Sequence, residues 1–135
     1  MESSEIAVDT RGRHVVDLST EVSSFLRDKG GDGGLLNVFV PHATAGLIVM
    51  ETGSGSEEDL EEALGRLLPR DDRYLHAHGS TGHGADHLLP LLAGPSLTVP
   101  VLDGRLTLGT WQRICLLDLN EDNPRRRVRL SFLAG

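Results

Sequence analysis

Apolar residues follow strand spacing at the start of the chain and helical spacing directly after it. Residues 3–18 contain two short apolar stretches separated by a glycine-containing turn at residues 11–13, which predicts two strands. After them, Val22, Phe25 and Leu26 lie at the spacing of one helix face, and a glycine-rich stretch ends this helix. We expect the helix to cover one face of a sheet.

The middle of the chain predicts two further strands and the clearest helix. Two Val-rich runs, residues 35–40 and 46–50, have strand length and predict a pair of central strands joined by a polar connection. Apolar residues then recur at helical spacing over residues 60–68, which predicts a helix with Ser56 and Asp59 as its cap and a proline as its stop.

The last part of the chain predicts a loop, a short helix and a run of strands. Residues 70–86 hold few apolar side chains and several glycines, so we expect a loop there, and residues 87–93 are Leu-rich enough for a short helix with Asp86 as its cap. The strands that follow are expected to form a β meander with a tight Asp-Gly hairpin; they cover residues 97–102, 106–119 and 126–133.

This order of elements indicates one α+β domain over residues 1–135, with much of its sheet antiparallel. The chain shows no internal repeat and no linker that would divide it. Aromatic residues make up 4% of the chain, so we expect an aliphatic core.

Charge and composition exclude several classes of partner. The net charge of -7 opposes binding to a phosphate backbone, so we expect no nucleic acid. The basic residues at 125–127 and at Arg129 alternate with apolar positions, which predicts a solvated strand face or an anion-facing rim. No apolar run is long enough to span a bilayer, and the first residues lack the pattern of a signal peptide. With Cys115 expected as a buried thiol, we predict a cytoplasmic protein.

Histidines are concentrated in or beside the segments expected to be loops. The chain has six histidines, where ordinary usage would give about three, and five of them lie in such segments: His42, His76, His78, His83 and His87. Neutral imidazole is a common metal ligand, so a shared metal site explains the excess. Exposed loop residues without a ligand are the alternative.

The spacing of the histidines favours two chelating pairs. His76 and His78 project to the same side of an extended segment, whereas His83 and His87 would share one face of a helix. The second pair has the spacing of a metalloprotease helix, but Gly84 stands where the catalytic Glu of such a helix would follow. We therefore reject the protease hypothesis.

Three segments together resemble the YjbQ family and span nearly the whole chain. They are Pro-His-Ala-Thr-Ala-Gly-Leu at residues 41–47 followed by Glu51, Tyr-Leu-His at residues 74–76 leading to His-Leu at 87–88, and Gly-Pro-Ser at 94–96 leading through Asp-Gly to Leu-Gly-Thr-Trp-Gln at 108–112. The last is the most specific, because a Leu-Gly-Thr-Trp-Gln run after an Asp-Gly hairpin is hard to obtain by chance.

The resemblance implies a two-sheet, β-sandwich-like α+β fold with two to three helices that assembles as a homotrimer. It implies His42, His76 and His87 as metal ligands. Its candidate pocket residues are Thr44, Trp111 and Gln112 for substrate binding and Glu51 for catalysis. Each has a structural alternative: core for the Trp, loop support for the Thr, and a helix cap for the Glu.

The chain departs from the family pattern beside two of these histidines. Ala77 stands where the family has an acidic or amide residue, and a Gly-His-Gly stretch at residues 82–84 replaces an Asp-Asn-Gly-like one. His78, His83 and Asp86 could substitute for the lost polar groups by orienting the ligand imidazoles, and their roles stay open at this stage.

The resemblance also implies an activity, secondary thiamine-phosphate synthase, which joins hydroxymethylpyrimidine pyrophosphate and thiazole phosphate. A divalent metal, Zn²⁺ for a histidine set or Mg²⁺ with a pyrophosphate substrate, would take up charge on the leaving group. The alternatives are a trimer that binds a metal or a small phosphorylated molecule without catalysis, and a metal-assisted hydrolase with Glu51 as its base.

Overall fold

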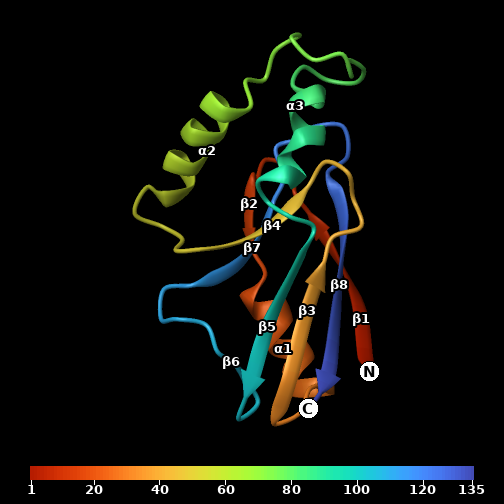
Figure 1. Ribbon diagram of the computed structural model, residues 1–135, viewed down its shortest axis with the longest axis vertical. Helices are drawn as coiled ribbons and strands as arrows, with labels where there is room; N and C mark the ends of the chain where they lie inside the picture. The colour runs from red at the N-terminus through yellow and green to blue at the C-terminus, as the bar shows by residue number, and fades with distance from the viewer.

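The computed structural model describes residues 1–135 and shows an α+β fold with two antiparallel sheets (Figure 1). The five-stranded sheet has the order β1 (Glu2–Asp9), β8 (Arg125–Ala134), β3 (Gly33–Phe39), β5 (Ser96–Leu102) and β6 (Arg105–Leu106). The three-stranded sheet has the order β2 (Val15–Asp17), β7 (Arg113–Leu117) and β4 (Gly46–Met50). The expected α+β class is therefore confirmed.

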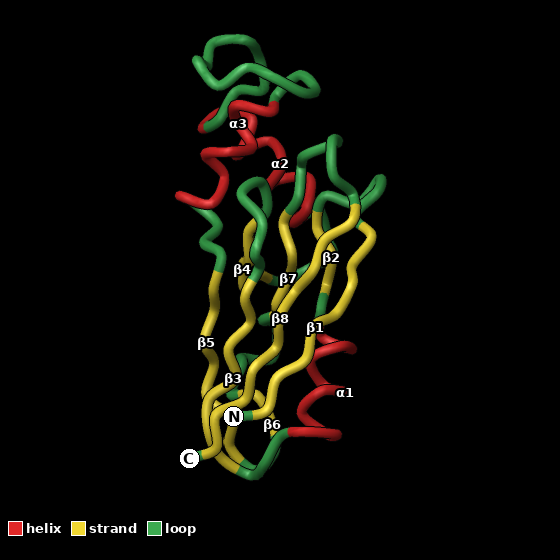
Figure 2. Tube along the Cα trace, turned by 90° about the vertical axis from the view of Figure 1, so that its right-hand side faces the viewer, coloured by secondary structure: helices red, strands yellow, loops and turns green.

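Three α-helices accompany the sheets: α1 (Ser19–Lys29), α2 (Ser56–Leu67) and α3 (His83–Leu88), the last continued by the 3₁₀ turn η1 (Leu89–Leu91). The strands run along the long axis of the molecule, with α2 and α3 at one end and α1 toward the other (Figure 2). None of the helices has the length and apolar character needed to cross a membrane.

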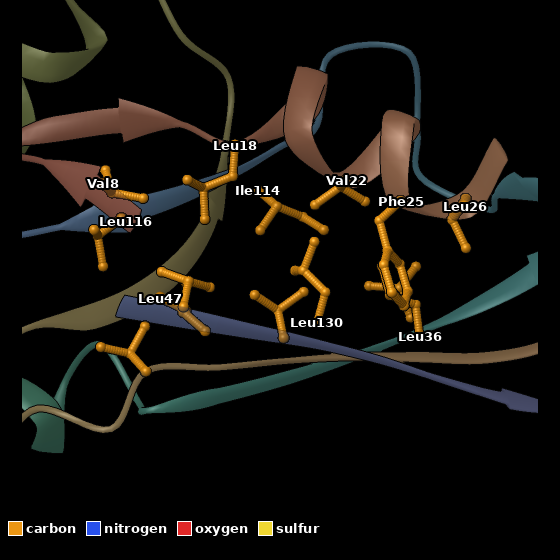
Figure 3. Close-up of a cluster of buried hydrophobic side chains, with 14 of the residues drawn as sticks. Val8, Leu18, Val22, Phe25, Leu26, Leu36, Leu47, Ile114, Leu116 and Leu130 are labelled. Carbon is orange, nitrogen blue, oxygen red and sulfur yellow. The ribbon is translucent and has the colours of Figure 1, made fainter. Parts of the chain in front are cut away.

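The main core lies between the sheets and is closed by α1 (Figure 3). Alternate residues of β8 point inward, so Val128 and Leu130 meet the buried Ile114 and Leu116 of the opposite sheet. The predicted helix face, which includes Val22, covers the same core and confirms the helical spacing. Full burial of each aliphatic side chain stabilises the fold by about 1.5–3 kcal/mol.

The strands expected to form a central pair belong to different sheets, so that prediction was wrong. β3 lies inside the five-stranded sheet, whereas β4 is at the edge of the other. Gly46 fixes the start of β4, because a Cβ there would lie 1.9 Å from the carbonyl oxygen of Ala93. The N–H of Leu47 donates to the carbonyl oxygen of Gly94 at 2.8 Å. This close backbone contact directs the chain out of the first sheet.

The expected meander is also interrupted. The hairpin between β5 and β6 is present, and Asp103 and Gly104 both have positive φ, 51° and 72°, as a tight turn requires. The chain then leaves this sheet and enters the other one as β7, while β8 returns between β1 and β3. One long strand over residues 106–119 does not form.

Helix boundaries differ from the pattern at two places. Ser56 and Asp59 do not cap α2: Gly55 occupies the cap position with φ 89°, and no side chain completes it. Helix α3 begins at His83 rather than at residue 87. The expected loop is therefore shorter, and His83 lies on a helix together with His87.

Arg126 is buried, although the basic stretch was expected to face solvent or a rim. It shares the inward parity of Val128 in β8, while Arg125, Arg127 and Arg129 point outward. Asp118 provides its partner, with Arg126 Nε donating to Asp118 Oδ2 at 2.7 Å. The two-residue period of β8 directs the Arg126 side chain into the core, and the carboxylate of Asp118 compensates its buried charge.

Candidate metal centre

Four histidines meet at the α3 end of the molecule. His76, His78, His83 and His87, called here the histidine cluster, each offer a ring nitrogen, and these four nitrogens lie within 4.8 Å of one another. Ring centroids are separated by 4.1 Å for His76 and His87 and by 4.3 Å for His78 and His83. The two pairs expected from spacing thus form one group.

Local backbone geometry places the histidines of each pair close to each other. His83 and His87 are one turn apart on α3 and face the same side, with their Nε2 atoms 2.9 Å apart. The segment with His76 packs closely on this helix because Gly84 lacks a side chain. A Cβ on Gly84 would lie 2.6 Å from both the carbonyl oxygen of His76 and the Cβ of Tyr74.

Asp122 supports the cluster from a distant part of the chain. Its carboxylate lies 2.7 Å from Nδ1 of His83 and accepts the backbone N–H of Ser80 at 3.1 Å. The Ser80 N–H and then the His83 ring hold the pKa of Asp122 below its usual range. With Nδ1 donating to this carboxylate, Nε2 of His83 is the nitrogen left to bind a metal.

A second contact fixes α3 beside the same segment. The Asn120 side chain donates to Oδ2 of Asp86 at 3.0 Å, and Arg70 forms an ion pair with the same buried carboxylate. Asp86 thus anchors the helix to residues before and after it in the chain. No described contact joins Asp86 to an imidazole, so its role differs from the imidazole-orienting one considered from the sequence.

His87 favours the neutral state that binds metals. Burial lowers the pKa of His87, and the neighbouring His76, His83 and His78 lower it further, because each charged ring would repel the others. A hollow of 110 Å³ in the surface loop gives access to three of the four rings. The cluster is therefore both reachable and set up for a cation.

The donor set suits a borderline transition metal. In a tetrahedral zinc site the ligand nitrogens are separated by about 3.4 Å. The 2.9 Å between Nε2 of His83 and Nε2 of His87 would open slightly, and the wider separations, up to 4.8 Å, would close around an ion. Imidazole nitrogen suits Zn²⁺, Cu²⁺ or Ni²⁺, whereas Mg²⁺ prefers oxygen. No carboxylate belongs to the group, so the residues fit zinc better than magnesium.

In the single chain, His42 does not belong to the histidine cluster. Its Nε2 accepts the backbone N–H of Arg127 at 2.9 Å. Burial lowers the pKa of His42, and the charges of Arg126 and Arg127 lower it further. Thr44 is nearby in the same network, because its hydroxyl accepts a hydrogen bond from Arg126 at 2.8 Å.

The remaining candidate residues lie apart from the histidines. Glu51 is exposed directly after β4, and Trp111 is 69% exposed in the segment before β7. Gln112 accepts the backbone N–H of Gly109 at 2.8 Å through its side-chain oxygen. The structure of a single chain does not bring these three into the histidine cluster.

Sequence reasoning did not identify Asp122, Asn120 or Arg70 as parts of the site. Asp122 contacts a residue 39 positions away, a separation over which no local period carries information. The available signal was a mostly polar run at residues 118–123 directly after the apolar residues 114–117. Such a run indicates a loop with functional or anchoring side chains, without giving their partner.

Comparison with known proteins identifies the family. The family model described as UPF0047 protein YjbQ-like matches residues 4–135. The chain belongs to the YjbQ family. This confirms the family inferred from the three sequence motifs.

Similar family members occur in bacteria and archaea. A UPF0047 protein of Mycobacterium tuberculosis is 62% identical over 135 residues, covering 100% of both chains, and UPF0047 protein YugU of Bacillus subtilis is 31% identical, covering 93% of each. A crystal structure of a hypothetical protein from Aeropyrum pernix K1 superposes with a TM-score of 0.90 at 36% identity, covering 100% of both chains. A Sulfolobus solfataricus structure, of a YbjQ-like protein of unknown function, gives a TM-score of 0.90 at 26% identity, covering 99% of this chain and 97% of that one. The two-sheet architecture is thus that of the YjbQ fold.

Proposed function

We propose that this YjbQ-family protein binds one divalent transition metal, Zn²⁺ in the first place, at the histidine cluster. The observation that carries the proposal is the convergence of four ring nitrogens within 4.8 Å. Without a ligand, the loop histidines His76 and His78 would gain little by lying against His83 and His87 of α3, since charged rings repel and neutral rings attract one another only weakly. A cation placed between them satisfies all four lone pairs.

The support around the cluster is that of a metal site. The carboxylate of Asp122 fixes one imidazole, and Gly84 lets the two histidine pairs approach. Ligand histidines in metalloproteins usually donate their second nitrogen to such a group. Four protein ligands leave no open position, which favours metal binding itself over catalysis at the metal.

Metal analysis after dialysis tests the proposal. We expect wild type to retain about one Zn²⁺ per chain, as one tetrahedral site requires, and His83→Ala and His87→Ala to lose it. His14→Ala is the matched control, because this histidine lies outside the cluster. Cobalt substitution adds a second readout, since tetrahedral Co²⁺ absorbs visible light strongly. Stoichiometric zinc in a variant lacking all four cluster histidines would place the site elsewhere.

His42 remains a candidate ligand from the family pattern through its Nδ1, because its Nε2 already accepts the N–H of Arg127. His42→Ala separates the two ligand sets. Retention of zinc by His42→Ala supports the cluster alone. Loss of zinc in His42→Ala would instead support a site formed by His42, His76 and His87.

We further propose that the protein forms a homotrimer through the five-stranded sheet. In Figure 1 no helix lies in front of β3, β5 and β8. The outward side chains of these strands include four exposed apolar residues, Leu35, Phe39, Leu102 and Leu133. An uncovered apolar sheet face gains stability when it packs against copies of itself. Light scattering at micromolar concentration should give three times the chain mass, and a monomer mass would contradict it.

The catalytic proposal for this family member is thiamine-phosphate synthesis. The carbon–oxygen bond to pyrophosphate breaks and a carbon–nitrogen bond to the thiazole forms, so a divalent cation is needed to take up the leaving charge. The family resemblance supports it, with Glu51 orienting a substrate or accepting a proton and with Thr44, Trp111 and Gln112 holding the substrate. Because these residues lie apart from the cluster in one chain, the reaction requires copies to complete the site.

Mass-spectrometric detection of thiamine phosphate tests this activity with added Zn²⁺ or Mg²⁺. Glu51→Gln should lower turnover by about 10²–10⁴-fold, the usual contribution of general acid–base catalysis. Equal product from wild type and Glu51→Gln would point to a contaminant. No product from metal-loaded wild type would leave a binding protein for metal or a small phosphorylated molecule.

The hydrolase alternative has less support from the geometry. Its proposed base, Glu51, is not among the groups around the cluster. The nearest carboxylate, Asp122, is already engaged by Ser80 and His83.

A further inference from the structure

A second concave site is lined by residues of α1, of β6 and of the segment that leads to β7. In Figure 1, α1 and β6 lie toward the opposite end of the molecule from α3. This groove has a volume of 410 Å³, within the range of small-molecule sites. Its floor is apolar and consists of Val22, Leu26, Leu106, Leu108 and Ile114. We call it the arginine groove, because three arginines line its rim.

The rim of the arginine groove carries an excess of positive charge. Arg27, Arg105 and Arg113 line the groove, and no acidic residue does. Arg27 has a loose ion pair with Asp28 at 3.7 Å, whereas the side chains of Arg105 and Arg113 form no ion pair or hydrogen bond. In a chain of net charge -7, a local group of three arginines, two of them without an ion pair, attracts an anion.

Gln112 adds an oriented donor beside these arginines. Its side-chain oxygen accepts the N–H of Gly109 at 2.8 Å. The amide nitrogen of Gln112 therefore remains free to donate a hydrogen bond to a ligand. The hydroxyls of Ser19 and Ser23 complete the polar lining. The charged and amide groups around this apolar floor are therefore all donors.

We propose that the arginine groove binds a small molecule with a flat apolar body and one anionic group, a phosphate or a carboxylate. The apolar floor takes the body, and the guanidinium groups bind the anion with charge-assisted hydrogen bonds. The site stands on the groove alone and does not depend on metal binding at the histidine cluster. The two proposals can therefore fail separately.

Nitrogen-15 NMR titration with phenyl phosphate tests the site. We expect shifts of the backbone amides of residues 19–27 and 104–114, with a Kd of about 1 mM for a ligand of this size. The indole N–H of Trp111, the only tryptophan, gives a single reporter beside Gln112. Inorganic phosphate and phenol, which each carry half of the recognised chemistry, should bind at least about tenfold more weakly. Benzoate in place of phenyl phosphate distinguishes a carboxylate site from a phosphate site.

The double variant Arg105→Gln/Arg113→Gln should bind phenyl phosphate about tenfold more weakly or worse, since each charge-assisted hydrogen bond it loses is worth more than a neutral one. Arg66→Gln is the matched control, because Arg66 is an exposed helical arginine outside the groove. Equal affinity of wild type and the double variant would overturn the proposal. So would shifts confined to other parts of the chain.

Discussion

Two groups of polar side chains in this protein differ in how many of their polar atoms have hydrogen-bond or ion-pair partners within the chain. The first, which we call the buried arginine network, joins Arg126, Asp118, Thr10 and Thr44. Arg126 donates twice to Asp118, at 2.7 and 2.9 Å, and once to Thr44, while the Thr10 hydroxyl donates to the same carboxylate at 2.7 Å. The side chains of Arg126 and Asp118 are 1% and 0% exposed.

The histidine cluster is the opposite case. It gathers four groups of one kind whose ring nitrogens face each other with no carboxylate among them. In the arginine network every charge has its counterpart in the same chain, so the network stabilises the fold. In the cluster only His83 has a carboxylate partner, Asp122, and the bound cation proposed above would supply the counterpart of the facing ring nitrogens. The two groups thus differ in whether their polar atoms are paired within the chain.

Removal of Asp118 should have the largest effect on folding. Asp118→Ala leaves the Arg126 guanidinium buried without its partner, which costs about 3–5 kcal/mol of unfolding free energy. Urea denaturation measures the loss. Glu5→Ala is the control, because its ion pair with Arg129 is partly exposed and contributes less than about 1 kcal/mol. A loss below that value in Asp118→Ala would show that the network is dispensable.

Asp122→Asn should weaken metal binding at the cluster by about 10–100-fold, the usual effect of losing a carboxylate that orients a ligand histidine. The amide still accepts the Ser80 N–H, so the loop should keep its place. Competition with a chromogenic chelator gives the affinity. Glu121→Gln, an exposed neighbour without a described side-chain contact, should bind zinc like wild type. Identical affinities for both variants would remove Asp122 from the site.

Acid should destabilise the apo protein partly through His42. Its folded pKa lies below 6.5, so the unfolded chain takes up the proton first, and stability is full above that pH and falls as pH drops below it. Protonation also ends the acceptance of the Arg127 N–H by Nε2. Solvent screening at this half-buried site limits the effect to about 0.5 kcal/mol. Urea midpoints from pH 7.5 to 5.0 should fall less in His42→Ala, and parallel curves would contradict this.

His14→Ala should have the smallest effect. Its side chain and that of its partner Glu61 are 44% and 43% exposed, so loss of the pair should change the unfolding free energy by no more than about 0.5 kcal/mol. Zinc content should stay at the wild-type level. Loss of zinc in this variant would mean that histidine number, rather than the cluster geometry, determines binding.

Local periods predicted much of the fold, since they act over a few residues. The helical spacing of Val22, Phe25 and Leu26 matches the buried face of α1. The Asp-Gly pair gives the hairpin between β5 and β6. Assignment of strands to sheets could not be predicted in this way. The separation of β3 from β4 depends on the packing of Gly46 against Ala93, which are far apart in sequence.

The candidate site, too, was predictable from the sequence only in part. Spacing alone placed His76 beside His78 and His83 beside His87, because residues two apart in an extended chain or four apart in a helix share a side. The glycines around His83 argued against a helix there. In the structure Gly82 adopts φ 89° at the helix start, and Gly84 makes room for the backbone of His76. Residues that oppose a helix locally are here required by the packing around it.

The sequence by itself determined the two histidine pairs and the family to which the chain belongs, but it did not predict the burial of Arg126. Only the tertiary structure decided that the two pairs form one cluster, that His42 lies in another network and that Asp122 supports His83. The physical reason is the range of the forces involved. Side-chain direction follows from the backbone over a few residues, whereas the meeting of distant groups depends on how the sheets and α3 pack, and this packing is set by all of their contacts together.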